Sequence, residues 1–294
     1  MKLKRVTVVV LAVVLLFALS SCGLTTTTDA LVCSLNSNRR TYTVDGFEVC
    51  ENGCYDPESE YNVEDCNCHP ANIVIDHYKK WPVSNVGIAA FEGCTHIQTV
   101  ELGKRVQYIE TSAFSGCTSL VSINFPNGLK NIGSKSFLNC SALTTVIIPD
   151  SVTDIGSEAF SGCSSVTTVT IGEGVNTIGA GAFKGCTDVT AVVVPDSVTE
   201  IGSEAFSGCK KLTYIVIGEN VTKIGAAAFS KCDKLKAVYY AGSLTGKERN
   251  ALFNLKTGKD DTKKVTTLVY AYSETQPEDN GRYWHYVDGV PTEW

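Results

Sequence analysis

The feature that most constrains the fold of this chain is a phrase ending in Phe-x-x-Cys that recurs at one constant spacing. It occurs seven times without insertion or deletion, from Phe91–Cys94 to Phe229–Cys232. Repetition at a fixed period of this size is typical of solenoids, in which each repeat is one structural unit that stacks on its neighbours. The repeat therefore predicts a rod or shallow arc of stacked coils.

Each coil contains an apolar run with the alternation of a short strand. In Leu143–Ile148 the apolar positions that recur in every coil are Leu143, Val146 and Ile148, which predicts a short strand with alternate residues pointing inward, and Pro149 ends the strand. A second apolar pair, Val152 and Ile155, is expected to return along the opposite wall of the coil. The glycine that follows this pair, Gly156, is expected to allow a turn that a Cβ would hinder.

The repeat predicts a mainly β solenoid of 23-residue coils over residues 73–241, with short turns and helical segments. No coil can bury its apolar residues alone, so stacking makes the core continuous. Stacked strands lie about 4.8 Å apart, which gives a length of roughly 35–40 Å. We expect the recurring phenylalanines to form the spine of this core and not a cofactor platform: Phe114, Phe137, Phe160, Phe183, Phe206 and Phe229.

The repeat cysteines occupy positions that call for a small buried residue. Free cysteine is among the most buried residue types, so the favoured interpretation is a row of buried reduced thiols. A chain of disulfides between adjacent coils is the alternative, because neighbouring coils lie within bridging reach. No histidine or carboxylate recurs beside these cysteines, so they are not expected to bind a metal.

The N-terminal residues 1–22 predict export and a lipid anchor. A basic start is followed by the apolar run Val6–Leu19, which is short for a membrane-spanning helix and typical of a signal peptide. The following Ser-Ser-Cys resembles a bacterial lipobox, which implies acylation of Cys22 and attachment to the membrane through acyl chains. The predicted location is extracytoplasmic and lipid-anchored at the bacterial cell surface. The alternative is an ordinary signal peptide that is cleaved near Ser21.

Residues 23–72 differ from the array in their high content of cysteine and turn-forming residues. We interpret them as a tether and a small disulfide-stapled module that caps the first coil. Five cysteines cannot all pair with one another, so one is free or pairs outside the module, with Cys94 as a candidate. A zinc site is the alternative, but an extracytoplasmic location favours oxidation, and we predict no metal and no cofactor. The candidate disulfide residues are Cys33, Cys50, Cys54, Cys66 and Cys68.

The period breaks after Tyr240, and residues 242–294 are expected to form an irregular final coil and a cap. Lys247–Leu255 is predicted as a short helix, and Val265–Tyr272 as a strand that stacks on the array. Terminal repeats must be shielded from solvent, so aromatic residues are expected to cover the open end of the core. An aromatic platform for sugars is the alternative. The residues concerned are Trp284, Tyr286 and Trp294.

The outward positions of the strands differ from coil to coil and become apolar and aromatic toward the C-terminal coils. Contiguous exposed apolar patches mark interaction sites, and tyrosine is enriched at binding hot spots. The alternative is that such residues simply favour strands. The candidate binding face consists of Val193, Tyr214, Val216 and Tyr239.

The segment from Leu143 to Cys163 resembles the BspA-type leucine-rich repeat found on bacterial cell surfaces, and the resemblance extends over residues 86–241. The tail from Tyr270 to Trp294 is similar to the terminal cap attached to such arrays. The resemblance implies a leucine-rich-repeat solenoid and a role in adhesion to host matrix proteins or to other cells. It implies no catalytic residue.

Charge and residue content argue against two other classes of function. The chain has a net charge of −6 and no clustered stripe of Lys and Arg along the sequence, so we predict no nucleic-acid partner. Its four histidines are scattered, and no nucleophile elbow or phosphate-binding loop occurs, so we predict no enzyme activity. The predicted function is non-catalytic binding or adhesion, with an extracellular protein or glycan as partner. The alternative is a structural spacer or display scaffold.

Overall fold

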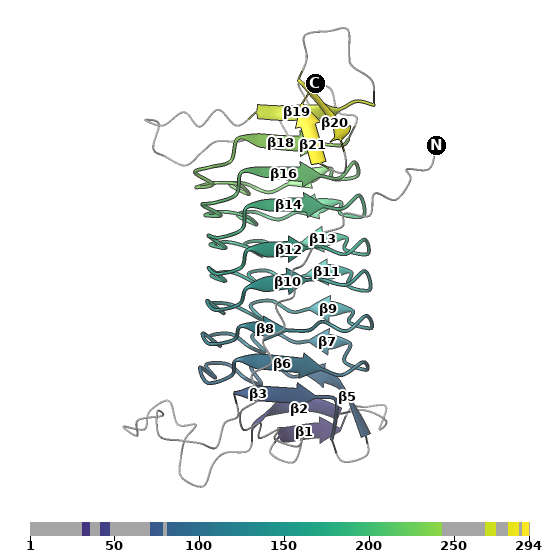
Figure 1. Cartoon of the computed structure of the whole chain (residues 1–294). Helices are drawn as coiled ribbons and strands as arrows, with labels where there is room; N and C mark the ends of the chain where they lie inside the picture. The colour runs from purple at the N-terminus through teal and green to yellow at the C-terminus, as the bar shows by residue number, and fades with distance from the viewer. Residues whose placement is uncertain are drawn as a thin grey trace.

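The computed structural model describes residues 31–35, 42–47, 71–78, 81–242, 268–274, 282–287 and 290–293. These residues form a stack of coils built from strands and turns, which confirms the predicted β solenoid (Figure 1). Helical segments were also predicted, but none occurs among the described residues. Lys247–Leu255, predicted as a helix, lies outside them.

Each coil contributes one strand to an outer wall and one strand to a return wall. The outer strands are β3 (Asn72–Ile75), β6 (Thr99–Leu102), β8 (Ser122–Ile123), β10 (Thr145–Ile147), β12 (Thr168–Thr170), β14 (Ala191–Val194), β16 (Tyr214–Ile217) and β18 (Ala237–Tyr240). The return strands are β5 (Trp81–Val86), β7 (Tyr108–Ile109), β9 (Asn131–Ile132), β11 (Asp154–Ile155), β13 (Thr177–Ile178), β15 (Glu200–Ile201) and β17 (Lys223–Ile224).

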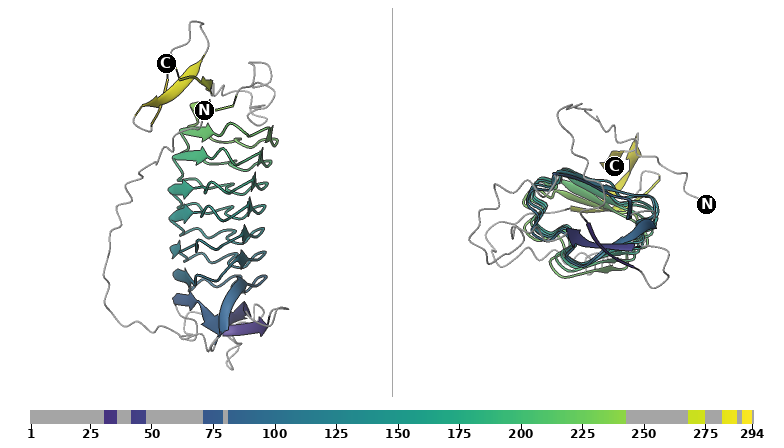
Figure 2. Two further views of the ribbon diagram at one scale, coloured as in Figure 1. Left: turned by 90° about the vertical axis from the view of Figure 1, so that its right-hand side faces the viewer. Right: turned by 90° about the horizontal axis from the view of Figure 1, so that it is seen from below.

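Successive coils are parallel and in register. Val146 pairs with Val169 in the outer wall, and Ile155 pairs with Ile178 in the return wall, so equivalent positions of successive repeats lie side by side. Viewed along the axis of the stack, the coils lie over one another (Figure 2). The residues at any one repeat position therefore form a ladder that runs along the solenoid.

The phenylalanine spine is confirmed. Rings in adjacent coils are nearly parallel, with centroids 5.1 Å apart for Phe137 and Phe160 and 5.9 Å apart for Phe206 and Phe229. Burial of one such side chain stabilises the fold by about 1.5–3 kcal/mol, and each ring pair adds about 0.5–1.5 kcal/mol. The spine is thus a large and continuous source of stability along the array.

The repeat cysteines are free thiols in the structure, in agreement with the favoured interpretation. Six of the seven are buried, and each of these donates a hydrogen bond to the phenylalanine carbonyl oxygen of the preceding coil. The distance from Cys163 Sγ to the Phe137 oxygen is 3.2 Å. Burial raises the pKa of Cys186 to about 12, so this thiol stays protonated at neutral pH.

Two positions in each coil have a left-handed backbone, and both lie in the turns around the Ala-Phe-x-x-Cys segment. One of these ladders includes Glu158 at φ 56° and Gly181 at φ 62°. Gly156 was expected to serve a turn, but its role is close stacking. A Cβ on Gly156 would lie 2.5 Å from the carbonyl carbon of Gly133, so the glycine lets adjacent backbones approach.

The N-terminal end of the array is extended by a hairpin. Strands β1 (Leu31–Leu35) and β2 (Tyr42–Phe47) are antiparallel, and β2 pairs with β5 of the return wall. Cys33 lies in β1. The other four cysteines of the predicted disulfide module lie outside the described residues, so the module stays a prediction.

The first coil is longer than the others. Asn72 of β3 pairs with Thr99 at a sequence separation of 27, whereas Asn85 of β5 pairs with Tyr108 at the usual separation of 23. Between the two walls β4 (His77–Tyr78) forms a hairpin with the start of β5, which accommodates the additional residues.

The C-terminal end continues the outer wall with three strands, β19 (Leu268–Tyr272), β20 (Tyr283–Val287) and β21 (Val290–Glu293). The predicted final strand is confirmed, because β19 pairs in parallel with β18. Strands β20 and β21 form an antiparallel hairpin that lies against the outside of the last coils (Figures 1 and 2). Within the described residues no helix has the length and hydrophobicity to cross a bilayer.

Candidate functional site

The candidate binding face lies on the outer wall, where every second strand residue points away from the core. The principal outward ladder begins at Val74 in β3 and passes through Glu101, Asn124, Ile147, Thr170 and Val193. All six of these side chains are exposed. The exposure of these residues agrees with the alternation of inward and outward positions along a strand.

The C-terminal half of the predicted face requires correction. Val193 is 42% exposed and Tyr214 is partly buried, but Val216 and Tyr239 are only 3% and 8% exposed. Both lie in a second hydrophobic cluster outside the solenoid core, together with Tyr270 and Trp284. The C-terminal strands therefore cover two of the four residues of the predicted binding face.

Aromatic contacts explain how this cover is held. The ring of Tyr239 lies 5.4 Å from the rings of both Tyr270 and Trp284. Trp284 is fully buried, and its indole Nε1 donates a hydrogen bond of 3.2 Å to the Tyr240 carbonyl oxygen. Trp284 also meets Tyr286 edge-on at 4.9 Å.

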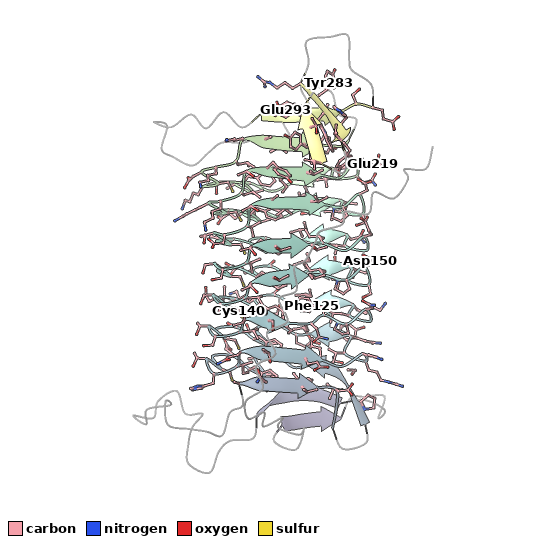
Figure 3. The ribbon with its side chains drawn as sticks, viewed as in Figure 1. Phe125, Cys140, Asp150, Glu219, Tyr283 and Glu293 are labelled. Atoms are coloured by element: carbon pink, nitrogen blue, oxygen red, sulfur yellow. The ribbon has the colours of Figure 1, made fainter. Side chains whose placement is uncertain are left out.

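Trp284 and Tyr286 form a cap, but not over the surface that was predicted. They were expected to close the open end of the core, and Trp284 covers the outer face of β16 and β18 instead. Because Trp284 is fully buried, it presents no free ring face to a sugar. Burial and the neighbouring Glu293 carboxylate raise the pKa of Tyr270 to about 12, which keeps this phenol neutral. Glu293 and the adjacent Tyr283 are labelled in Figure 3, and Trp294 lies outside the described residues.

The apolar strip, as we call it, consists of the exposed residues Ile147, Thr170 and Val193 and of the neighbouring Tyr214, which is partly buried. Ile147 is 57% exposed and belongs to the same ladder as Val193. Ile147 was not among the predicted residues of the binding face. The signal that could have found it is the repeat itself, because Ile147 and Val193 are separated by two coils in the same ladder.

An acidic ladder borders the strip where each outer strand ends. It consists of Asp150, Glu173, Asp196 and Glu219, and Figure 3 labels the first and last of these. The Asp150 carboxylate accepts a hydrogen bond of 2.9 Å from the Glu173 backbone N–H, and Asp196 does the same for Glu219. Partial burial, with repulsion from Asp196 and Asp150, raises the pKa of Glu173. The aspartates thus have a structural role in the corner.

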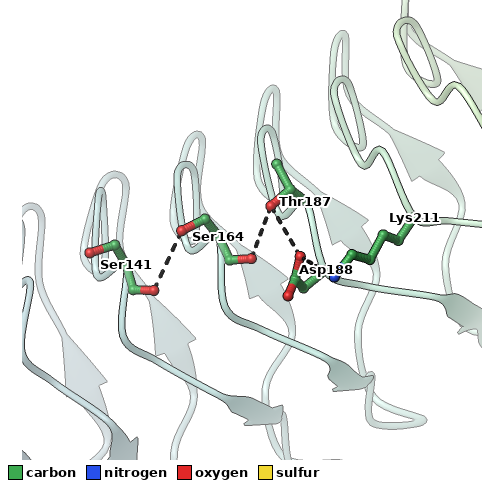
Figure 4. A network of polar contacts seen from close by, with 5 residues as sticks. All are labelled: Ser141, Ser164, Thr187, Asp188 and Lys211. Carbon is green, nitrogen blue, oxygen red and sulfur yellow. Dashed lines mark hydrogen bonds and ion pairs between the residues drawn. The ribbon is translucent and has the colours of Figure 1, made fainter.

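A ladder of hydroxyl groups borders the opposite side of the strip, where each outer strand begins (Figure 4). The Ser164 hydroxyl donates to the Ser141 carbonyl oxygen at 3.5 Å, and the Thr187 hydroxyl donates to the Ser164 carbonyl oxygen at 3.1 Å. The ladder ends at an ion pair of 3.0 Å between Lys211 and Asp188.

The described residues contain no group of three or more His, Cys, Asp or Glu side chains placed to hold a metal ion. The lipidation candidate Cys22 and the cysteines Cys50, Cys54, Cys66 and Cys68 lie outside those residues. Of the predicted site residues in the described part of the chain, those of the binding face lie together on the outer wall. Two of these four residues are covered.

Comparisons with known proteins agree with the repeat geometry. A profile described as the BspA type leucine rich repeat region matches six copies, over residues 67–190 and 160–263. A leucine-rich repeat protein of T. pallidum is 24% identical and covers 80% of this chain and 97% of its own, with a TM-score of 0.62, which supports the fold.

A leucine-rich cell surface protein from Faecalibacterium prausnitzii A2-165 is 31% identical, with a TM-score of 0.60. The match covers 76% of this chain and 56% of that protein, so the present chain spans little more than half of its length. No curated protein matches the chain.

Proposed function

Because this chain belongs to the BspA-type leucine-rich repeat family, whose members are generally bacterial cell-surface proteins, we propose that it is a non-catalytic surface binding protein. In this proposal the apolar strip contacts an extracellular protein or glycan. The family and its fold are typical of proteins without enzyme activity.

The observation that supports the proposal is the exposure of two apolar side chains in the same ladder of the strip. Ile147 is 57% exposed and Val193 is 42% exposed, and only Thr170 separates them in the ladder. Contiguous exposed apolar surface is unfavourable in water and commonly marks an interaction site. Strands that are fixed by parallel pairing lose little conformational freedom when a partner binds, which favours affinity.

Strand propensity alone does not account for the strip. The same outward ladder carries Glu101 and Asn124 in preceding coils. Glu101 lies in β6 and pairs in register with Val74, so an apolar residue is not required at this position. Asn124 lies just beyond β8, where its side chain bonds to the Leu102 backbone instead. The apolar residues of the strip are therefore not needed for strand formation, which favours a role in binding.

We also propose that the protein is tethered to the membrane through acyl chains on Cys22, following the lipobox-like sequence. Replacement of Cys22 by Ala is expected to abolish incorporation of radiolabelled palmitate. Continued labelling of the variant would contradict the anchor at this residue.

The binding proposal is tested with the full-length protein in mild detergent, presented to arrays of purified matrix proteins and glycans. The test variant carries Ile147→Thr and Val193→Thr, since Thr170 occupies the same ladder within β12. The matched control carries Ile88→Thr and Val121→Thr, two substitutions at exposed apolar positions outside the strip. Circular dichroism checks that both variants are folded.

We expect the test variant to bind at least tenfold more weakly than the wild type, because interface hot spots contribute about 2 kcal/mol or more each. The control is expected to bind as the wild type does. Equal affinity of the two variants would refute the strip as the contact surface. A wild type that binds no component of either array would favour the spacer alternative.

A further inference from the structure

The corner that precedes β16 and β18 carries five exposed lysines, which we call the lysine edge: Lys210, Lys211, Lys231, Lys234 and Lys236. They come from two successive coils and lie on the side of the outer wall opposite the acidic ladder. Lys211 is labelled in Figure 4, where it extends the hydroxyl ladder toward the C-terminal coils.

Coil stacking brings these lysines together. Lys211 and Lys234 occupy the same repeat position in adjacent coils. The backbone N–H of Lys211 donates to the Thr187 carbonyl oxygen at 3.0 Å, and that of Lys236 donates to Thr213 at 2.9 Å. These bonds hold both residues at the start of the outer strands. The sequence analysis found no clustered basic stripe, and the structure corrects this for the last two coils.

The lysine edge interrupts a regular feature of the repeat. At the same corner position earlier coils have Ser141, Ser164 and Thr187, whose hydroxyls bond to the coil before them. The next coil has Lys210 there, which cannot make this hydroxyl bond. Departures from a structural rule without local compensation are characteristic of functional positions.

The charge of the edge is only partly compensated. Among the described residues Lys211 forms an ion pair with Asp188, and Lys231 lies close enough to Glu204 to help lower the pKa of its carboxyl, whereas no ion pair involves Lys210, Lys234 or Lys236. Asp233 is the one acidic residue between Lys231 and Lys236. The chain as a whole carries a net charge of −6, so the positive charge of the edge comes from the clustering of lysines there and not from an excess of basic residues in the chain.

The residue types indicate the chemistry of the ligand. The segments 207–213 and 230–236, which form the edge, contain neither arginine nor an aromatic residue. Proteins that bind single-stranded nucleic acids combine positive charge with aromatic side chains on which bases stack. Lysine is a compact point charge on a flexible stem, which suits anionic groups spaced along a flexible polymer.

We propose that the lysine edge binds an anionic polysaccharide that carries sulfate or phosphate groups. This site is separate from the apolar strip and goes beyond the function proposed above. It would allow the solenoid to contact a charged glycan along one edge and a second partner on its outer face.

The probe is immobilised dextran sulfate, with uncharged dextran of equal length as the reference. The test variant of the full-length protein carries Lys210→Gln, Lys234→Gln and Lys236→Gln. Lys211 is retained because of its ion pair with Asp188. The matched control carries Lys104→Gln, Arg105→Gln and Lys130→Gln, which removes the same charge from exposed positions elsewhere on the solenoid.

We expect the test variant to bind dextran sulfate at least tenfold more weakly at 0.1 M salt. The slope of log affinity against log salt concentration should fall by about two, since each neutralised anionic group contributes roughly 0.7 in flexible polyanions. The control should retain the affinity and slope of the wild type.

Three results would overturn the proposal. Equal losses in the two variants would show that only net charge matters, and an unchanged test variant would remove the lysine edge from binding. Tighter binding of single-stranded DNA than of dextran sulfate would assign the edge to nucleic acid. Circular dichroism of each variant ensures that a loss of binding does not come from unfolding.

Discussion

Phe160 lies in the middle of the phenylalanine spine, and its replacement by alanine tests whether the spine stabilises the array coil by coil. Its ring is stacked on Phe137 at 5.1 Å and on Phe183 at 5.4 Å, and it meets Phe125 edge-on at 6.3 Å. At the end of the spine, Phe229 is 7% exposed and has one ring neighbour within the described part of the chain, Phe206, at 5.9 Å.

The two sites therefore predict different losses of stability. A buried Phe→Ala replacement costs about 3–5 kcal/mol, and each aromatic pair contributes about 0.5–1.5 kcal/mol. Phe160→Ala removes three ring pairs from a fully packed site, so we expect a loss of about 5 kcal/mol. Phe229→Ala removes one pair at a slightly open site, and we expect about 3 kcal/mol. Phe160→Leu, which keeps most of the volume, should cost about 1.5 kcal/mol.

Urea unfolding followed by circular dichroism measures these differences. Each coil contacts only its neighbours, so a defect at Phe160 should also weaken the coupling between the two halves of the array. We expect a broader transition for Phe160→Ala than for Phe229→Ala, together with faster amide hydrogen exchange in the coils on both sides of Phe160. Losses that agree within about 0.5 kcal/mol at the two sites, a difference smaller than one aromatic pair, would refute the additive spine.

Two further predictions concern the thiols and the cap. Burial raises the pKa of Cys186 to about 12 and that of the partly exposed Cys94 to about 11, so iodoacetamide should modify Cys94 slowly and Cys186 only after denaturation. Peptide mass spectrometry measures the extent of modification at each cysteine. Modification of Cys94 should rise as the pH approaches the pKa of its thiol. Labelling of native Cys186 at mildly alkaline pH would contradict the prediction. Replacement of Trp284 by Phe removes its hydrogen bond to the Tyr240 carbonyl and should lower stability by about 1–2 kcal/mol in urea unfolding. Trp284→Ala should in addition expose Tyr239, detected as faster proteolysis of the C-terminal hairpin, and unchanged cleavage would argue against the cap.

The regular part of the fold could be predicted because its determinants are local and recur in every coil. The pattern of Leu143–Ile148 sets which residues point inward, and the equivalent residues of the next coil adopt the same conformation. The spine of Phe137 and Phe160 and the burial of Cys163 follow from that repetition. Gly156 was correctly expected to be required, but for a turn. Its actual role is close contact between adjacent backbones, which the sequence of one coil does not reveal.

The candidate surface was only partly predictable, because exposure depends on segments that do not repeat. The outward direction of Val193 and Tyr239 followed from strand alternation. The burial of Tyr239 depends on Trp284, which belongs to the tail beyond the last regular coil and packs against it.

The sequence by itself thus determined the coil, its period, its core and the direction in which each strand residue points. Those properties follow from short-range alternation and from the need of each coil to bury its apolar face against the next. The tertiary structure decided which outward residues stay open and which charges meet. The cap leaves Ile147 and Val193 exposed and covers Val216, and stacking places Lys211 beside Lys234. Both outcomes require contacts between residues far apart in the chain, and no local pattern encodes such contacts.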